Sequence, residues 1–145
     1  MKAPLFYSKI LLFGEYGIIE DSKGLSIPFN FFKGGLRIGD MSELIEKESN
    51  LNLKKFRDYL LKIEITTVEF DFEKLNLDLD KGMFFDSSIP QGYGVGSSGA
   101  LVAAFYDRYA INKITVLENL TKSKILVLKN IFSTMESFFH GKSSG

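Results

Sequence analysis

Residues 90–100 read Pro-Gln-Gly-Tyr-Gly-Val-Gly-Ser-Ser-Gly-Ala, a glycine-rich segment that leads into a helix-forming run ending at Tyr109. Closely spaced glycines let the backbone approach a bound group and present several N–H donors to it. The helix that follows would point its unsatisfied amides and its positive dipole end into the same loop. The segment therefore predicts an anion site, most naturally for phosphate. The alternative is a tight strand-to-helix turn that Ser97 or Ser98 caps.

Two other phosphate motifs are excluded by their surroundings. Residues 94–99 match G-x-G-x-x-G, but they lie late in the chain, and no strand-ending acid follows about 20 residues on. Glu118 stands at that distance, inside a helical pattern. Residues 141–143 resemble the end of a P-loop, yet Glu136 occupies the place of its first glycine.

Length and composition limit the classes of function. The chain has 145 residues, 45% of them hydrophobic, which suits one domain with a sizeable core. Eighteen basic residues balance eighteen acidic ones, so no net field attracts nucleic acid or an anionic membrane. Without cysteine and with His140 as the single histidine, thiolate chemistry and a histidine metal site are excluded. No apolar run reaches the length of a membrane span, and no leader peptide is apparent, so we expect a soluble, cytoplasmic domain.

Hydrophobic periodicity predicts an α+β domain, with strands first and helices later. The clearest predicted helix is Ser97 to Tyr109, because it begins directly after the glycine-rich loop. The expected strands are residues 5–20 with a break at Gly14, several short antiparallel strands in 25–38, an exposed strand at 63–72 and another at 81–89. The expected helices are residues 41–48, 51–61, 97–109 and 115–140, the last broken near Ser123.

Three ordered segments resemble motifs of the GHMP small-molecule kinases. Residues 90–100 resemble the second, phosphate-binding motif, P-x-x-x-G-L-G-S-S-A-A, with Val95 for Leu and Gly99 for Ala. Residues 8–16, Ser-Lys-Ile-Leu-Leu-Phe-Gly-Glu-Tyr, look like the first motif, P-G-K-x-x-L-x-G-E-H/Y. Residues 136–145 resemble the third motif of mevalonate kinases, E-x-x-x-H-G-x-x-S-G-x-D. Within the superfamily, the chain is therefore most similar to the N-terminal portion of mevalonate kinases.

The resemblance implies an ATP-dependent kinase that transfers the γ-phosphoryl group to a hydroxyl of a mevalonate-like alcohol, in isoprenoid precursor synthesis. For residues 1–145 it implies a ribosomal protein S5 domain 2-like fold, as the N-terminal ATP-binding domain that a C-terminal domain completes. It implies that Gly92, Gly94, Gly96, Ser97, Ser98 and Gly99 bind the nucleotide, that Ser98 and Glu136 hold Mg²⁺, and that Lys9 is catalytic and offsets phosphate charge. Such a site suits phosphoryl transfer, which needs positioning and charge neutralisation more than covalent catalysis.

Departures from the motifs leave alternatives open. The Asp that closes the third motif would fall two positions after Gly145, so residues 1–145 are expected to be inactive alone. Ser8 for Gly and Tyr16 for His lie near the acceptor side, which leaves phosphomevalonate, a sugar or homoserine open as acceptors. A hypothesis from another class is a non-catalytic module that binds a nucleotide or another anion.

Each candidate residue also has an ordinary structural interpretation. Lys9 could be a solvated charge at the start of a strand, and Glu15 an ordinary turn residue. Glu136 and His140, four residues apart on a helix, could simply pair with each other. The 14 phenylalanines are expected in the core rather than in a ligand platform, and surplus aromatic surface leaves a homodimer open.

Overall fold

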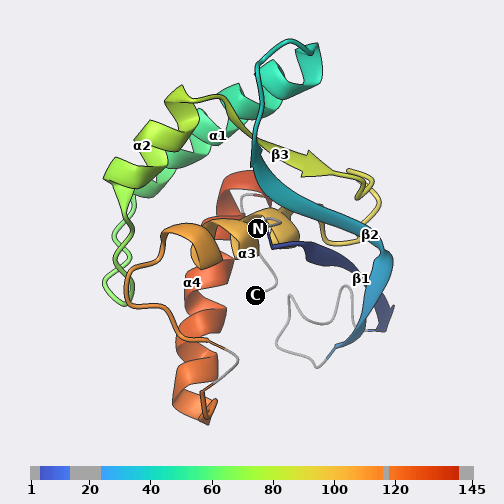
Figure 1. Cartoon of the computed structure of the whole chain (residues 1–145). Helices are drawn as coiled ribbons and strands as arrows, with labels where there is room; N and C mark the ends of the chain where they lie inside the picture. Colours follow the sequence, from blue (N-terminus) through green and yellow to red (C-terminus); the bar gives the residue numbers. More distant parts are fainter. Residues whose placement is uncertain (1–3, 14–23, 116–117, 141–145) are drawn as a thin grey trace.

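The computed structural model of the chain describes residues 4–13, 24–115 and 118–140, and the structural statements below concern these residues. They form an α+β domain in which strands make one antiparallel sheet and helices pack against it (Figure 1). The fold class expected from the hydrophobic pattern is therefore confirmed. In chain order the elements are β1 (Phe6–Phe13), β2 (Leu25–Ile38), α1 (Leu44–Lys62), α2 (Phe72–Asp80), β3 (Met83–Ser87), α3 (Ser97–Tyr109) and α4 (Lys122–His140).

The central strand of the sheet is β2, which has β1 on one side and β3 on the other. In the described sheet β3 pairs with residues 34–38, so residues 25–33 of β2 have β1 as their neighbour. The prediction of several short strands in this region was wrong, because Pro28 does not interrupt β2. It lies opposite Lys9, where β2 is paired on one side, and a missing N–H is tolerated there.

An irregularity in the β1–β2 pairing precedes Lys9. The register changes between Tyr7 and Ser8, and residues 30–32 of β2 are passed over. Ser8 is buried, and its hydroxyl donates a hydrogen bond of 2.7 Å to the Phe29 carbonyl. The serine that replaces the glycine of the first motif therefore has a structural role in the strand.

Helix α3 is the central helix of the domain. Seven of its thirteen residues are buried, and it packs against β1, β2 and α4. Phe105 of α3 and Phe56 of α1 are fully buried, with ring centroids 4.9 Å apart. Because α3 is enclosed on several sides, its N-terminus is held in a defined place relative to the sheet.

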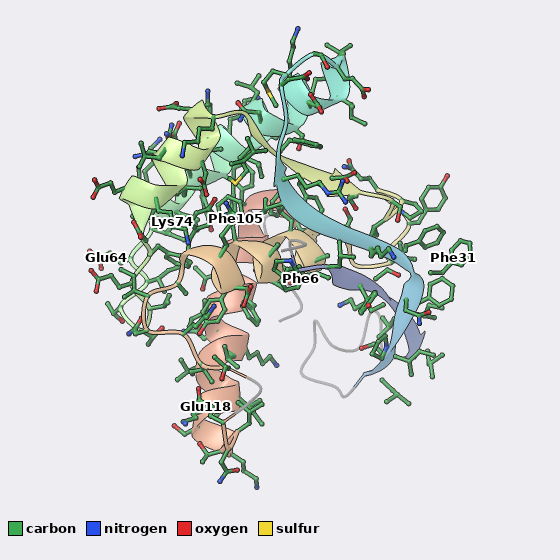
Figure 2. The ribbon with its side chains drawn as sticks, viewed as in Figure 1. Phe6, Phe31, Glu64, Lys74, Phe105 and Glu118 are labelled. Atoms are coloured by element: carbon green, nitrogen blue, oxygen red, sulfur yellow. The ribbon has the colours of Figure 1, made fainter. Side chains whose placement is uncertain are left out.

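Most of the phenylalanines pack in or against the core, as expected, but Phe31 does not. Its side chain is 73% exposed and projects from β2 away from the body of the domain (Figure 2). Its ring contacts those of Phe29 and Phe32, with centroids 6.0 and 5.0 Å away. This small aromatic cluster therefore lies outside the core.

One helix, α1, replaces the two helices expected in residues 41–48 and 51–61. The polar pair Ser49–Asn50 does not break the helix, because its side chains bind the neighbouring elements. The Ser49 hydroxyl accepts a hydrogen bond from the Phe85 backbone N–H of β3. The buried Asn50 amide donates to the carbonyl oxygens of Leu79 and Met83, at 3.0 and 2.7 Å.

The strand expected at residues 63–72 is absent from the described structure. Only Phe70 makes a β-bridge there, to Ala110, and α2 begins at Phe72. The alternating pattern of residues 63–72 wrongly predicted a strand. Val68 is buried in the core although it belongs to no strand. The Asp71 carboxylate accepts a hydrogen bond from the Lys74 backbone N–H and so caps α2, which the prediction missed.

Other boundaries were predicted closely. Strand β1 lies within residues 5–20, although residues 14–20 fall outside the described part, and β3 lies within 81–89. Helix α3 has the expected bounds. The expected helical tract from residue 115 begins later, at Lys122, where Thr121 accepts a hydrogen bond from the Lys124 N–H, and it continues without a break at Ser123.

Candidate functional site

The glycine-rich loop connects the end of β3 to the start of α3. Three hydrogen bonds tie the entrance of the loop to β2, and they join the backbone and hydroxyl of Ser88 to the backbone of Lys33 at 3.0, 3.1 and 3.2 Å. Ile89 is buried, whereas the next residues emerge from the core, and Tyr93 is 80% exposed. The loop therefore has a fixed base and an exposed middle.

Three glycines of the loop have backbone angles that favour glycine. Gly92, Gly94 and Gly96 have φ angles of 81°, 68° and 87°, in the left-handed region. At Gly96 the space is also restricted, because an added Cβ would lie 3.0 Å from Lys9 Cγ. Gly96 is thus required both for its backbone conformation and for the approach of β1 to the loop.

The N-terminus of α3 has no side-chain cap. Gly96 is the N-cap residue, and as a glycine it has no side chain that could accept a hydrogen bond from the first amides of the helix. Ser97 and Ser98 belong to the first turn, so the alternative of a turn capped by either serine is wrong. The first amides of a helix need partners outside it, and here the N-cap residue supplies no side-chain acceptor for them.

Lys9 lies beside this N-terminus. Its backbone N–H donates a hydrogen bond of 2.9 Å to the Val95 carbonyl, and its aliphatic stem contacts Gly96. The side chain is exposed, as the solvated-charge interpretation expected, and its backbone and aliphatic stem lie at the edge of the loop. A lysine there favours the binding of an anion.

Helix α4 brings two side chains to Ser98. The Ser98 hydroxyl donates to Glu136 Oε1 at 3.3 Å, and His140 Nε2 lies 2.8 Å from the same oxygen. Gly99 makes room for the carboxylate, since a Cβ on it would stand 3.2 Å from Glu136 Oε1. Residues almost 40 positions apart in the sequence thus meet at the first turn of α3.

Ser98 and Glu136 present two oxygen atoms of the kind that Mg²⁺ binds. In octahedral coordination at about 2.1 Å, neighbouring ligand oxygens lie about 3 Å apart, which is close to the 3.3 Å between Ser98 Oγ and Glu136 Oε1. Within the described residues, no three His, Cys, Asp or Glu side chains form a complete metal-binding group. The pair fits a cation that arrives with a phosphate ligand better than a metal held by the protein alone.

Comparison with models of protein families identifies the family of this chain. The family model described as GHMP kinases N terminal domain matches residues 52–145, well over half of the chain. The chain belongs to the GHMP kinase family. Members of this family generally use ATP. No significant match was found among curated proteins or among solved structures.

The match covers the loop, α3 and α4 of the GHMP kinase domain, but not Lys9 and the rest of the first motif. Of the residues expected in the site, the structure brings Lys9, Ser98 and Glu136 to one end of α3. Residues 14–16 of the first motif and 141–145 of the third lie outside the described part of the chain. In that described part, no helix is both long and apolar enough for a membrane crossing.

The contact of His140 with Ser98 was not foreseen from the sequence. The four-residue spacing of Glu136 and His140 indicated one helix face, which is correct, but it suggested a pair within α4. In the structure both side chains reach Ser98 of another helix. The four-residue spacing indicates that Glu136 and His140 share a face of α4. That this face contacts Ser98 depends on how α4 packs against α3.

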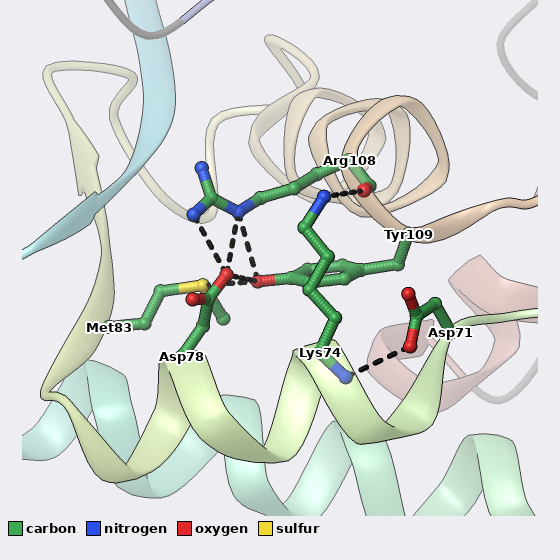
Figure 3. Close-up of polar contacts among 6 residues, drawn as sticks. All are labelled: Asp71, Lys74, Asp78, Met83, Arg108 and Tyr109. Atoms are coloured by element: carbon green, nitrogen blue, oxygen red, sulfur yellow. Dashed lines mark hydrogen bonds and ion pairs between the residues drawn. The ribbon is translucent and has the colours of Figure 1, made fainter.

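A polar network at the opposite end of α3 was also not predicted (Figure 3). The Arg108 guanidinium donates to Asp78 Oδ2 at 2.8 and 3.0 Å, and the Tyr109 hydroxyl donates to the same oxygen at 2.9 Å. Burial alone would lower the pKa of Arg108, but the interactions with Asp78 and Tyr109 together outweigh it and raise that pKa. Burial, reinforced by Asp78, raises the pKa of the Tyr109 hydroxyl. The network joins α3 to α2 about 20 Å along the helix from the loop.

Proposed function

We propose that this GHMP kinase domain binds Mg·ATP at the loop and the N-terminus of α3, for transfer of the γ-phosphoryl group to a hydroxyl of a mevalonate-like alcohol. The observation that carries the proposal is the convergence of Lys9, Ser98 and Glu136 on the end of α3, whose N-cap residue is the last of three glycines with left-handed backbone angles. A helix N-terminus with a glycine-rich entrance favours phosphate.

The residues of the proposed site would have different roles. The amides of Gly92, Gly94, Gly96, Ser97 and Gly99 would bind the phosphate oxygens, because backbone donors need no rearrangement as charge develops. Ser98 and Glu136 would hold Mg²⁺, which neutralises phosphate charge when it is bound. Lys9 would place a positive charge at the same edge of the loop and stabilise the negative charge that develops on oxygen atoms in the transition state.

In the proposed reaction the hydroxyl oxygen of the alcohol forms a bond to the γ-phosphorus, and ADP leaves with the bridging oxygen. We propose that the hydroxyl proton passes to a carboxylate, as the resemblance to the third motif implies. The chemistry requires positioning and charge neutralisation, which are the two properties that the loop and its neighbours provide.

The acceptor is proposed from the third motif, through Glu136 and His140. Phosphomevalonate, a sugar and homoserine are the alternatives, because Ser8 and Tyr16 depart from the first motif. Coupled ADP-release assays of the protein with mevalonate and with these three alternatives distinguish the acceptors. Turnover of mevalonate above the others supports the proposal, and turnover of none of them contradicts the acceptor. Nucleotide binding without turnover would favour the non-catalytic binding module.

Calorimetry tests the nucleotide site directly. Mg·ATP should bind the 145-residue chain, and Ser98→Ala and Glu136→Gln should each weaken binding about tenfold or more. Ser123→Ala and Glu73→Gln are matched controls, because both residues are exposed, Glu73 on α2 and Ser123 in the first turn of α4, 13 residues before Glu136. A folded wild-type chain that binds no Mg·ATP would contradict the site.

Two further properties remain proposals. We propose a cytoplasmic location, which cell fractionation tests, and a homodimer, which light scattering tests. The exposed aromatic cluster around Phe31 supports an apolar contact between copies, since exposed apolar patches mark interaction surfaces. A monomer at micromolar concentration would contradict the dimer.

A further inference from the structure

The single histidine of the chain makes a hydrogen bond that the proposed site does not yet use. His140 Nε2 lies 2.8 Å from Ser98 Oγ, a shorter distance than the 3.3 Å from Ser98 Oγ to Glu136 Oε1. His140 and Glu136 are one turn apart on α4, so both act on the same hydroxyl from one helix face.

A serine hydroxyl has one hydrogen to donate and lone pairs that accept. In the described geometry Ser98 donates its hydrogen to Glu136, so a 2.8 Å contact with His140 requires Nε2–H to donate to Ser98. This places a proton on Nε2, as in one of the two tautomers of histidine.

Binding of a cation would change this arrangement. A cation between Ser98 Oγ and Glu136 Oε1 needs a lone pair from each oxygen, so the Ser98 hydrogen can no longer point at Glu136. Among the described residues, His140 Nε2 is the other hydrogen-bond partner of Ser98 Oγ. It can accept the hydrogen once the ring carries its own proton on Nδ1.

We propose that His140 is a positioning residue, which accepts the Ser98 hydroxyl hydrogen in the cation-bound state and so keeps the Ser98 lone pairs directed at the cation. The inference rests on the proposed function, because it assumes that Ser98 and Glu136 bind Mg²⁺ with the nucleotide. Groups that orient a metal ligand in this way alter metal affinity although they do not touch the metal.

Calorimetry with ADP in the presence of Mg²⁺ or of a chelator gives the first test. His140→Ala should weaken Mg·ADP binding about tenfold and leave binding in chelator unchanged. His140→Gln should restore much of the affinity, because its amide oxygen can reach the position of Nε2, whereas the shorter His140→Asn should not. In the Ser98→Ala background, His140→Ala should have no further effect.

Nuclear magnetic resonance gives a second test that no merely structural role would satisfy. With ¹⁵N-labelled histidine the chain has one imidazole, at His140. The nitrogen shifts of this ring report its tautomer. The Nε2–H form is expected without cation, and the Nδ1–H form with Mg·ADP. Ser98→Ala should shift the Nε2 resonance and abolish the change of tautomer.

The outcomes separate the inference from the proposed function. A folded wild-type chain without Mg²⁺-dependent ADP binding would overturn both. If Mg·ADP binds but His140→Ala binds equally well, or weakens binding equally in chelator, the inference alone is overturned. An unchanged tautomer on addition of Mg·ADP also overturns it, as does an additive effect of His140→Ala with Ser98→Ala.

Discussion

Gly96 and Lys9 are in direct contact, so that a Cβ on the glycine would lie 3.0 Å from Lys9 Cγ. The neighbouring Lys9 N–H donates to the Val95 carbonyl at 2.9 Å. Strand β1 and the glycine-rich loop are therefore joined by a backbone hydrogen bond as well as by packing. A substitution at Gly96 would disturb both the loop and the position of the lysine.

Gly96→Ala is expected to destabilise the domain more than Gly92→Ala. Both glycines have left-handed φ angles, 87° and 81°, so each alanine introduces strain of about 1–2 kcal/mol. Only at Gly96 would the added Cβ also press on Lys9, since nothing lies within 4 Å at Gly92. Urea unfolding of the two variants measures the difference, and equal free energies of unfolding would show that the contact does not matter.

Asn50→Ala is expected to reduce the free energy of unfolding by about 2–4 kcal/mol, because it leaves the buried carbonyls of Leu79 and Met83 without their donor. Asn52→Ala, at an exposed position of the same helix, is the control and should change it by less than about 0.5 kcal/mol. Chemical denaturation compares them. Similar losses in both variants would mean that the two hydrogen bonds contribute little.

Stability is expected to fall as the pH rises above about 10, because of Tyr109. Its pKa is raised in the folded state by burial and by its bond to Asp78, whereas the unfolded chain deprotonates near the ordinary value. Above that value the folded state holds more protons than the unfolded state, so a further rise in pH favours unfolding. The contribution is complete below about pH 10 and is lost as the pH approaches the folded pKa.

Thermal unfolding of wild type and Tyr109→Phe between about pH 8 and pH 11 checks this. At the lower pH the variant shows the constant loss of its hydrogen bond to Asp78, and at higher pH its stability should fall less steeply than that of wild type. Parallel curves would contradict the assignment to Tyr109.

Phe105→Ala is expected to destabilise the domain by about 3–5 kcal/mol, because the fully buried ring leaves a cavity beside Phe56. Phe31→Ala removes a ring that is 73% exposed and should cost less than about 1 kcal/mol. Calorimetric melting of both variants provides the comparison. If Phe31→Ala destabilises as strongly, the ring is buried in solution, for example between two copies of the chain.

Local structure followed closely from the sequence where side chains interact with their own element. The loop and α3 were predicted with their bounds, since a run of glycines followed by helix formers leaves little choice of backbone. Predictions failed where distant partners decide. The apolar spacing predicts two helices, at residues 41–48 and 51–61, yet hydrogen bonds from Ser49 and Asn50 to β3 and to the end of α2 keep α1 continuous.

By itself, the sequence determined the α+β class, the glycine-rich loop and the residue types of the candidate site, because these depend on local backbone preferences and on the order of the motifs. The tertiary structure decided which side chains contact one another. Ser98 meets Glu136 and His140 because α4 packs against α3, and Lys9 meets Gly96 because β1 lies beside the loop. Such contacts depend on how whole elements pack, and hydrophobic periodicity does not encode the side chain that each element meets.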